Sequence, residues 1–474
     1  MSIEQFSRRS LLLRSGGGFG ALAASTLLPS ASSGAVSPLA PKPAPFPAKA
    51  RSVIYLFQHG APSHVDTFDP KPELQKRDGQ SLPSSLAAAI KTSFIQDPAN
   101  AKILGSPWQF RPGGKSGLLV SDLFPHVRER ADELAVIRGC YGDVFDHSPA
   151  MYLRLSGAQF PGRPSLGSWV TYGLGSENQD LPAFVVMTDG SMKSGPPVYG
   201  SGFLPGSYQG TLLRKAGDPI LYLKNPPGIR DTTQKRTLSF IEQMNRDHLT
   251  DRAEDKTLEA RLLSYELAFR MQAAAPGAVD LSKESKATRD LYGIDEAPTD
   301  DMGRKCLLAR RLVERGVRFV QLFSGTNVGT DWDDAHTDLV SSHEKMAKKT
   351  DKPIAGLLAD LKSRGLLDST LVVWGGEFGR TPIAQGRNGR DHHPYGFSIW
   401  MAGAGIQGGR ALGGTDELGV AAVEMPVDAH DVNATILRLL GYDHVRLTYL
   451  YQSREYRLTD VHGDREFSSR LLSV

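Results

Sequence analysis

Six short apolar runs recur along the chain, and each is continuous rather than alternating. They lie at residues 53–57 (VIYLF), 134–137, 184–187, 317–323, 371–374 and 397–401. A strand that is buried on both faces needs no polar side chain on either one, so a continuous run of β-branched and aromatic residues is typical of it. The pattern therefore predicts six strands of one buried sheet.

Helical patterns precede two of these strands. Residues 302–315 end at Gly316, which suits the C-cap of a helix, and residues 338–364 predict one or two helices that end at Gly365. Helices that alternate with strands through short connections favour a parallel sheet with right-handed crossovers. The predicted fold class is therefore α/β, with a central, mostly parallel sheet flanked by helices.

The other segments indicate the domain organisation. Residues 190–230 are rich in Gly and Pro and predict a long surface insertion, and residues 236–275 predict a charged amphipathic helix. Closely spaced prolines predict a stiff, extended linker over residues 36–49. Residues 50–474 are then expected to form a single α/β domain that carries the insertion.

The first 35 residues have the pattern of an export signal. Ser7-Arg8-Arg9 precedes Leu11–Leu13, and an apolar stretch over 16–28 runs into small residues that suit a signal peptidase. We expect a twin-arginine signal peptide, the twin-arginine export machinery as a partner, and a bacterial protein that is periplasmic or secreted. A retained anchor is the alternative, but the stretch is shorter than the ~20 residues of a spanning helix. No stable membrane span is therefore expected in the mature protein.

The composition of the chain disfavours several classes of protein. Lys and Arg number 55 against 52 Asp and Glu, a balance that gives no electrostatic reason to expect nucleic acid as the main partner. Two cysteines, Cys140 and Cys306, are too few for a disulfide scaffold or a four-thiolate zinc site, although one disulfide stays open. A twin-arginine oxidoreductase is disfavoured, because no glycine-rich nucleotide loop follows the first strand and no cysteine cluster is present.

Polar side chains collect where the predicted strands end, which is where open parallel sheets bind ligands. These residues are His59, His64, Asp66 and Asp69; Asp331, Asp333, Asp334 and His336; and Glu377, Asp391, His392 and His393. A mixture of imidazole and carboxylate favours zinc, manganese or iron over calcium. Each group alone also fits helix caps, turns or solvated charges. Together they predict a metal site at the sheet edge.

Two further residue groups have open interpretations. Arg380 could bind a phosphate or sulfate oxyanion bidentately, or it could pair with Glu377. Asp428 or His430 is interpreted as the N-terminal cap of a packing helix rather than as part of the site.

Three motifs carry a family resemblance. They are W-D-x-x-H at 332–336, G-E-F-G-R-T-P at 376–382 and G-R-D-H-H at 389–393, and they accompany the twin-arginine start. With them the chain, from Arg51 to its last helix, resembles the exported, sulfatase-like proteins of domain-of-unknown-function family number 1501 in the alkaline phosphatase superfamily. The resemblance implies an alkaline phosphatase/sulfatase-like sandwich and one or two divalent ions, with zinc or manganese favoured.

The resemblance also implies a ligand set. Carried over to this sequence, the metal ligands are His59, Asp66, Asp333, His336, Glu377, Asp391 and His392, with His393 in reserve.

The nucleophile segment departs from the sulfatase pattern. Where sulfatases present Cys or Ser, this chain has His147-Ser148-Pro149-Ala150 leading to Leu155-Ser156-Gly157. Formylglycine chemistry is not supported, since it starts from Cys or Ser at that position. His147 could be a metal ligand, His147 could be the nucleophile, or Ser148 could attack with His147 as base. His147 could also only cap the helix that begins at Ser148-Pro149.

The expected function is that of an exported, metal-dependent hydrolase of phosphate or sulfate esters, with His147, Ser148 and Arg380 as candidate catalytic residues. The alternative is a non-catalytic sulfatase-like protein that binds sulfated or phosphorylated polysaccharide. In that case Tyr199, Phe203 and Tyr208 of the insertion could stack on sugars, although ordinary loop packing also explains them.

Overall fold

The computed structural model describes residues 38–87, 90, 94–190, 192–214, 225, 228–250, 265, 267, 270–271, 274–325, 331–463 and 469–472. Within these ranges eight strands form one central sheet. In spatial order they are β12 (Arg410–Leu412), β4 (Leu134–Cys140), β11 (Phe397–Ala402), β8 (Thr370–Gly375), β1 (Ser52–Gln58), β7 (Phe319–Ser324), β5 (Phe184–Met187) and β6 (Thr211–Leu213). All six strands predicted from apolar runs are among them.

The sheet is mostly parallel, as predicted. β1 lies at its centre and pairs in parallel with β7, through Val53 and Phe319, and with β8, through Ser52 and Thr370. β11 is the exception, because it runs antiparallel to both β4 and β8. The apolar run at 397–401 carries no sign of this reversal, since a strand that is buried on both faces has the same composition in either direction.

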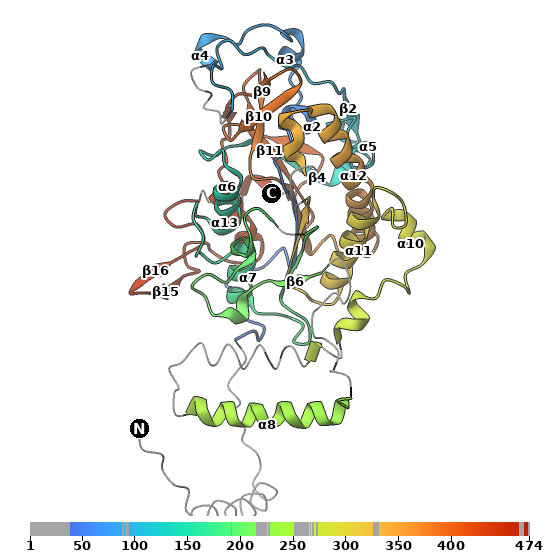
Figure 1. Ribbon diagram of the computed structural model, residues 1–474, viewed down its shortest axis with the longest axis vertical. Coiled ribbons are helices and arrows are strands. Elements are labelled where there is room, and N and C mark those ends of the chain that lie inside the picture. Colours follow the sequence, from blue (N-terminus) through green and yellow to red (C-terminus); the bar gives the residue numbers. More distant parts are fainter. Residues whose placement is uncertain are drawn as a thin grey trace, which may run out of the picture. The chain divides into compact units, whose positions relative to one another are not determined.

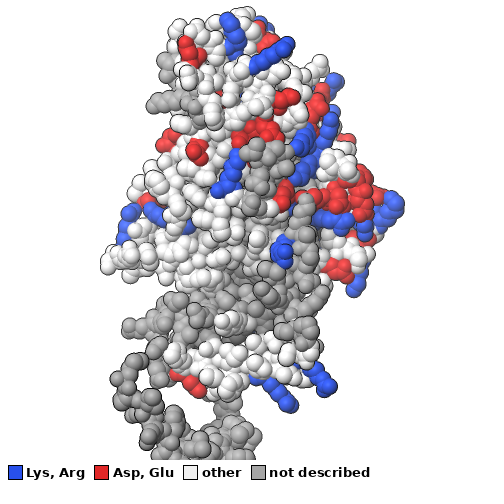
Figure 2. All heavy atoms as spheres, in the orientation of Figure 1, with Lys and Arg blue, Asp and Glu red and all other residues white. Residues whose placement is uncertain are grey.

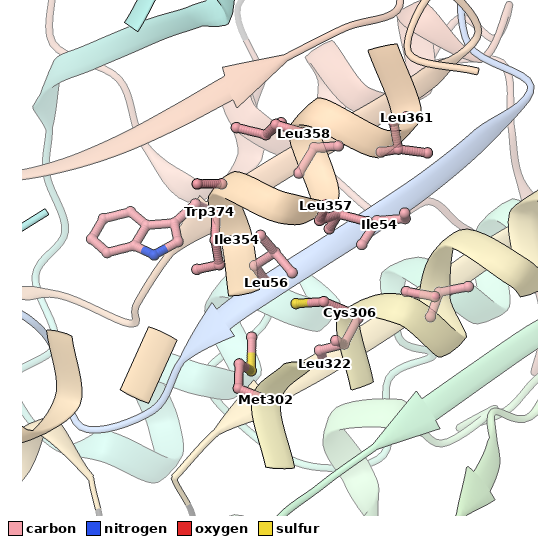
Figure 3. Packing of buried hydrophobic residues seen from close by; sticks show 14 of the residues in the cluster. Ile54, Leu56, Met302, Cys306, Leu322, Ile354, Leu357, Leu358, Leu361 and Trp374 are labelled. Atoms are coloured by element: carbon pink, nitrogen blue, oxygen red, sulfur yellow. The ribbon is translucent and has the colours of Figure 1, made fainter. Parts of the chain in front are cut away.

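Helices cover both faces of the sheet (Figure 1). On one face, α11 (Asp300–Glu314) and α12 (Leu339–Ser363) pack through Cys306 and Leu357 against Ile54 and Leu56 of β1 (Figure 3). On the other face, α6 (His147–Ser156), α7 (Leu166–Leu174) and α13 (Ala429–Leu439) pack against the alternate residues of β1. The predicted α/β fold is confirmed.

The structure describes further elements besides these. The helices are α2 (His64–Thr67), α3 (Pro72–Lys76), α4 (Ser84–Ala87), α5 (Pro125–Arg128), α8 (Asp231–Thr250) and α10 (Lys286–Leu291), with 3-10 turns η1 (Ala131–Glu133), η2 (Pro196–Tyr199), η3 (Gly206–Tyr208) and η4 (Trp332–His336). The hairpins are β2–β3 (Phe110–Gly113, Leu118–Ser121), β9–β10 (Gly379–Gln385, Gly389–His393), β13–β14 (Gly414–Thr415, Ala422–Glu424) and β15–β16 (Tyr449–Tyr451, Arg454–Tyr456).

Two segments are hydrogen-bonded to the rest of the domain more closely than their composition indicated. In the described part of the 190–230 insertion, β6 pairs in parallel with β5 and forms an edge of the central sheet. The Pro-rich segment before β1 lies along the domain, since the backbone amides of Lys42, Phe46 and Lys49 donate to the carbonyls of Leu174, Gly441 and Leu439. Proline-rich backbone can therefore be extended and still have its polar groups paired.

The cysteines do not form a disulfide. Cys140 packs on the α6–α7–α13 side of the sheet and Cys306 on the α11–α12 side, and both are free and buried. Burial raises the pKa of the Cys140 thiol to about 12, so it stays protonated at ordinary pH.

The predicted signal peptide lies outside the described residues, as does much of the predicted helix over 236–275. Among the described helices, none is both long enough and apolar enough to cross a lipid bilayer. Around α10, acidic and basic side chains lie side by side on the surface (Figure 2), and they include the ion pairs Lys286–Asp290 and Arg289–Asp295.

Candidate metal centre

The site lies at the carboxyl ends of three adjacent parallel strands. β1 is followed by His59, β7 by the segment that carries Asp331 and Asp333, and β8 by Glu377. Because β8, β1 and β7 are neighbours in the sheet, their ends meet at one edge. His147, at the start of α6, and His392, on β10, reach the same place from outside the three strands.

Asp333 is the centre of the cluster. Its Oδ1 atom lies 2.8 Å from Nε2 of His147, 3.2 Å from Nε2 of His336 and 3.1 Å from Nε2 of His392. The side chains of these residues are all less than one-fifth exposed. Three imidazole nitrogens therefore converge on one carboxylate oxygen.

The outer nitrogens of three histidines are held by other acceptors. Nδ1 of His147 lies 2.6 Å from Oε1 of Glu377, and Nδ1 of His59 lies 2.9 Å from Oδ2 of Asp331. Nδ1 of His336 contacts Oε1 of Gln385. Because carboxylate and amide oxygens only accept, each Nδ1 is the donor, and in a neutral ring Nε2 then carries the lone pair.

In a neutral ring, the lone pair of His147 Nε2 faces Asp333 Oδ1, so two acceptors lie 2.8 Å apart. Nε2 of His336 accepts from Nη1 of Arg380 over 3.1 Å and lies 2.8 Å from Nε2 of His392. Two further buried atoms, Nε2 of His59 and Oε2 of Glu377, have no hydrogen-bond partner among the described residues. A proton on His147 or a cation between its Nε2 and Asp333 reconciles the contact between these two acceptors.

The pKa values of His147 and Asp333 are both shifted so that the charged form is favoured. Burial by itself lowers the pKa of His147, but the carboxylates of Asp333 and Glu377 outweigh it, so the pKa is raised above the ordinary histidine value. Burial acts to raise the pKa of Asp333, but contacts with His147, His336 and His392 hold it well below its usual range. Both carboxylates of the cluster are thus held ionised, with histidines around them.

The backbone at Gly60 explains how the strand ends approach so closely. Gly60 has a φ of +97°, and a Cβ atom there would collide with the backbone nitrogens of Trp332 and Asp333. A residue with a side chain would therefore push Asp333 away from the turn after β1. The Gly60 amide also donates to Oε1 of Glu377 over 3.0 Å, which joins this turn to the end of β8.

Arg380 is a buried residue that holds part of the cluster in place by hydrogen bonds. Its guanidinium is fully buried and donates to the carbonyls of Gly60 and Ala61 and, over 2.8 Å, to Asp333 Oδ1. The sequence left a pairing with Glu377 open, but that carboxylate contacts His147 and Gly60 instead. Arg380 thus holds Asp333 and does not face solvent.

Lys193 reaches the cluster from the insertion. Its Nζ lies 2.8 Å from Oδ2 of Asp333, and its side chain is 29% exposed. The loop is fixed on α6, because the hydroxyl of Tyr152 donates to the carbonyl of Ser194 over 2.8 Å. Sequence reasoning missed Lys193, since a single lysine in a Gly/Pro-rich segment has no distinguishing pattern.

Some predicted residues lie away from the cluster. Asp66 forms a fully buried ion pair with Arg390, 2.7 Å between Oδ2 and Nε, and has no contact with Asp333. Burial acts against ionisation of Asp66, yet Arg390 and His343 lower its pKa. The reserve ligand His393 bonds to the carbonyl of Val420. Both residues are engaged in holding the loops around the site.

The candidate nucleophile segment is also clarified. Asp146, not His147, is the N-cap of α6, and its carboxylate accepts from the Ser148 amide, so the capping interpretation of His147 is wrong. The hydroxyl of Ser148 lies 3.4 Å from that of Ser194.

Asp391, another predicted ligand, accepts from the backbone amides of Phe94 and Ile95, which anchors the loop of these two residues beside His392.

The donor set fits a divalent cation. The described residues contain one group of His147, Asp333 and His392, and a second of His336, Asp391 and His392, each with ligand atoms close enough to share an ion. Metal-binding histidines usually donate their other ring N–H to a carboxylate, carbonyl or amide, as His147, His336 and His59 do here. These His and Asp groups could therefore hold a metal ion.

A family model matches most of the chain. It is described as "Protein of unknown function (DUF1501)", and it matches residues 50–466. The chain belongs to this family. The resemblance drawn from the three motifs is thus confirmed, and all the residues of the cluster lie inside the matched range.

Solved structures with some likeness to this one include a sulfatase and an alkaline phosphatase. The PsFucS1 sulfatase from Pseudoalteromonas sp. is 13% identical, with a TM-score of 0.38 over 89% of this chain and 72% of that one. Alkaline phosphatase from the Antarctic bacterium TAB5 is 10% identical, with a TM-score of 0.35 over 83% of this chain and 99% of that one. The lipoteichoic acid synthase LtaP from Listeria monocytogenes is 8% identical, with a TM-score of 0.36 over 91% and 80%. No curated protein matches the chain.

Proposed function

We propose that this protein is an exported, metal-dependent hydrolase of phosphate or sulfate esters. The observation that carries the proposal is the convergence of three imidazole Nε2 atoms on Asp333 Oδ1, with two of the rings held in the ligand tautomer by Glu377 and Gln385. Export through the twin-arginine pathway, to the periplasm or the outside, is part of the proposal and rests on residues 1–35 of the sequence.

The chain's own residues have distinct roles in this proposal. His147, Asp333 and His392 would hold one divalent ion, and His336, Asp391 and His392 form an overlapping alternative group of ligands. Nε2 of His59 and Oε2 of Glu377 are buried and have no hydrogen-bond partner among the described residues, so they are candidates to complete the coordination. When bound, the cation would supply Lewis-acid polarisation of an ester oxygen.

An anionic ester is favoured by the charge at the edge of the cluster. Lys193 is partly exposed and lies beside Asp333, so its ammonium can bind a non-bridging oxygen of a phosphate or sulfate. Arg380 acts differently from the role first predicted for it. Because it is buried and bonded to Asp333, it is a positioning residue that keeps this carboxylate ionised and in place.

The nucleophile is best assigned to water rather than to a side chain. Both ring nitrogens of His147 lie against carboxylates, so this histidine is a ligand rather than an attacking group. Ser148 lies beside Ser194 and has no described contact with Asp333 or Glu377. His59, whose Nδ1 is held by Asp331, offers Nε2 to hold a ligand or a proton.

The experiment is an assay with aryl phosphates and aryl sulfates on the tag-free mature protein, residues ~36–474, after replenishment with zinc or manganese. We expect turnover of one ester class that disappears in Glu377→Ala/His392→Ala. His126→Asn is the matched control, because this histidine is exposed on α5 and lies outside the cluster. The absence of turnover with either class after replenishment would reject the proposal.

A second candidate, a non-catalytic binding protein for sulfated or phosphorylated polysaccharide, is favoured by one observation. Phe203 of the insertion stacks on Tyr451 of the β15–β16 hairpin, and Arg163 and Arg454 lie over the ring of Tyr456. Tyr208, in contrast, is buried and packs internally. Polysaccharide binding that survives Glu377→Ala/His392→Ala, in a protein without turnover, would favour this candidate.

A further inference from the structure

A second group of metal-ligating side chains lies away from the sheet edge. It consists of Asp428 and His430, at the start of α13, and His462, in a turn near the C-terminal end of the chain. One candidate ligand atom from each lies within 4.8 Å of the others. The sequence predicts only a helix cap in this region, and Asp428 is that cap.

The tautomer of His430 is fixed by its surroundings. Its Nε2 lies 3.1 Å from the carbonyl oxygen of Gly157, which can only accept, so Nε2 carries the hydrogen. In the neutral ring Nδ1 then has the lone pair, and this atom lies 3.4 Å from Oδ2 of Asp428. An imidazole lone pair and a carboxylate oxygen thus face each other, an arrangement that a cation between them stabilises.

His462 completes the group. Its ring lies 4.6 Å from that of His430, centroid to centroid, and it is exposed, so an ion can enter from solvent. The carboxylate of Asp428 has its other oxygen occupied as a helix cap by the amides of His430 and Asp431. One oxygen of Asp428 and one nitrogen from each histidine therefore remain for a ligand.

The turn that carries His462 is held in place before any ion binds. The hydroxyl of Thr459 lies 2.7 Å from Nδ1 of His444, and Asp460 pairs with Arg163 and Arg454. Gly157, with a φ of +68°, allows the backbone at Leu458 to approach the end of α6, because a Cβ atom there would collide with the Leu458 carbonyl. The three ligands thus come from anchored segments.

We propose that Asp428, His430 and His462 form a separate divalent-metal site, suited to zinc, that holds the C-terminal turn against the adjoining ends of α13 and α6. Two imidazoles and one carboxylate are a donor set that zinc accepts, and at a surface water completes the coordination. α6 and α13 lie side by side (Figure 1), with His147 at one end of α6 and Gly157 just after the other. Ten helical residues separate the two sites by about 15 Å.

The test measures zinc content by mass spectrometry on tag-free full-length protein that has been stripped with a chelator and dialysed against zinc. His462→Asn should lose one equivalent relative to the parent, and Asp428→Asn should bind zinc more weakly although asparagine still caps the helix. His126→Asn, the exposed control, should keep the full content. Equal zinc content in the parent and His462→Asn would overturn the proposal.

A second measurement separates this site from the one at the sheet edge. In His392→Ala, zinc should still raise the melting temperature, and adding His462→Asn should abolish that shift. Should His392→Ala fail to fold, zinc-edge X-ray absorption of the parent and of His462→Asn gives the same comparison through the loss of one histidine-rich zinc environment. An unchanged spectrum or an unchanged shift would contradict the proposal, whatever the outcome of the ester assay.

Discussion

Two groups of histidine and aspartate side chains in this protein differ in how the fold builds them. At the sheet edge, Asp333 and its histidines come from three separate segments, η4, α6 and β10, that meet at the carboxyl ends of the parallel strands. Near α13, Asp428 and His430 are neighbours in one helix start, and only His462 comes from elsewhere. The first group depends on the whole sheet, while the second depends on one cap and one turn.

The two groups also differ in how deeply their side chains are buried. The sheet-edge residues are largely shielded from water, so charges there interact strongly and an uncompensated one is costly. His462 is exposed, and the Asp428 side chain is 26% exposed, so water can serve the second group when no ion is bound. We therefore expect the sheet edge to control activity and the α13 group to contribute only to local stability.

The largest expected effect comes from removing ligands at the sheet edge. His392→Ala should lower ester turnover by about 10³-fold or more, because Lewis-acid polarisation is worth several kcal/mol in the transition state. Steady-state assays of the metal-replenished protein measure this effect. Asp428→Asn is the matched variant of the other group and should leave turnover within about twofold. Equal losses in the two variants would remove the distinction between the groups.

A smaller effect is expected from Asp331, which holds His59 and also accepts from the backbone amide of Asp333. Asp331→Ala removes the acceptor for Nδ1 of His59, 2.9 Å away, and should weaken metal binding at the sheet edge by roughly 10–100-fold. Competition with a chromophoric chelator gives the affinity. Asp331→Asn should recover part of the loss, because an amide oxygen also accepts. An unchanged affinity in Asp331→Ala would show that His59 is not part of the site.

The shielding of the sheet edge should also appear in the pH dependence of stability. Burial lowers the pKa of His343 from 6.5 to about 3, and its Nε2 accepts from the Ser63 amide, so the folded protein keeps this ring neutral. The unfolded chain takes up the proton first as pH falls below 6.5. The folding free energy attributable to this ring is therefore lost with falling pH, by about 2 kcal/mol at pH 5.

Urea denaturation of the parent and of His343→Phe at pH 7 and pH 5 checks this prediction. The phenyl ring keeps the packing against Trp332 but has no proton to bind. The loss of unfolding free energy between the two pH values should therefore be smaller in the variant by about 2 kcal/mol. Parallel losses would indicate that His343 is accessible to protons in the folded state.

The smallest effect is expected at Ser148. Its hydroxyl contacts Ser194 rather than the cluster, so Ser148→Ala should change ester turnover by less than about threefold. A loss comparable to that of His392→Ala would instead make Ser148 the nucleophile.

The parts that could be predicted from sequence are those with a local signal. Continuous apolar runs predict β1, β7 and β8, and the polar residues that follow these strands include Asp333 and Glu377. The pairing of Asp66 with Arg390 could not be predicted, since it joins residues 324 positions apart and nothing near either one indicates the other. The antiparallel direction of β11 and the approach of Lys193 depend likewise on long-range packing.

The most direct test of the central claim is anomalous X-ray diffraction at the zinc and manganese edges, from crystals of the mature protein grown with each metal. The account predicts a peak about 2.0–2.3 Å from ligand atoms of His147, Asp333 and His392. The absence of a peak among these three residues, in crystals that bind the metal elsewhere, would contradict it.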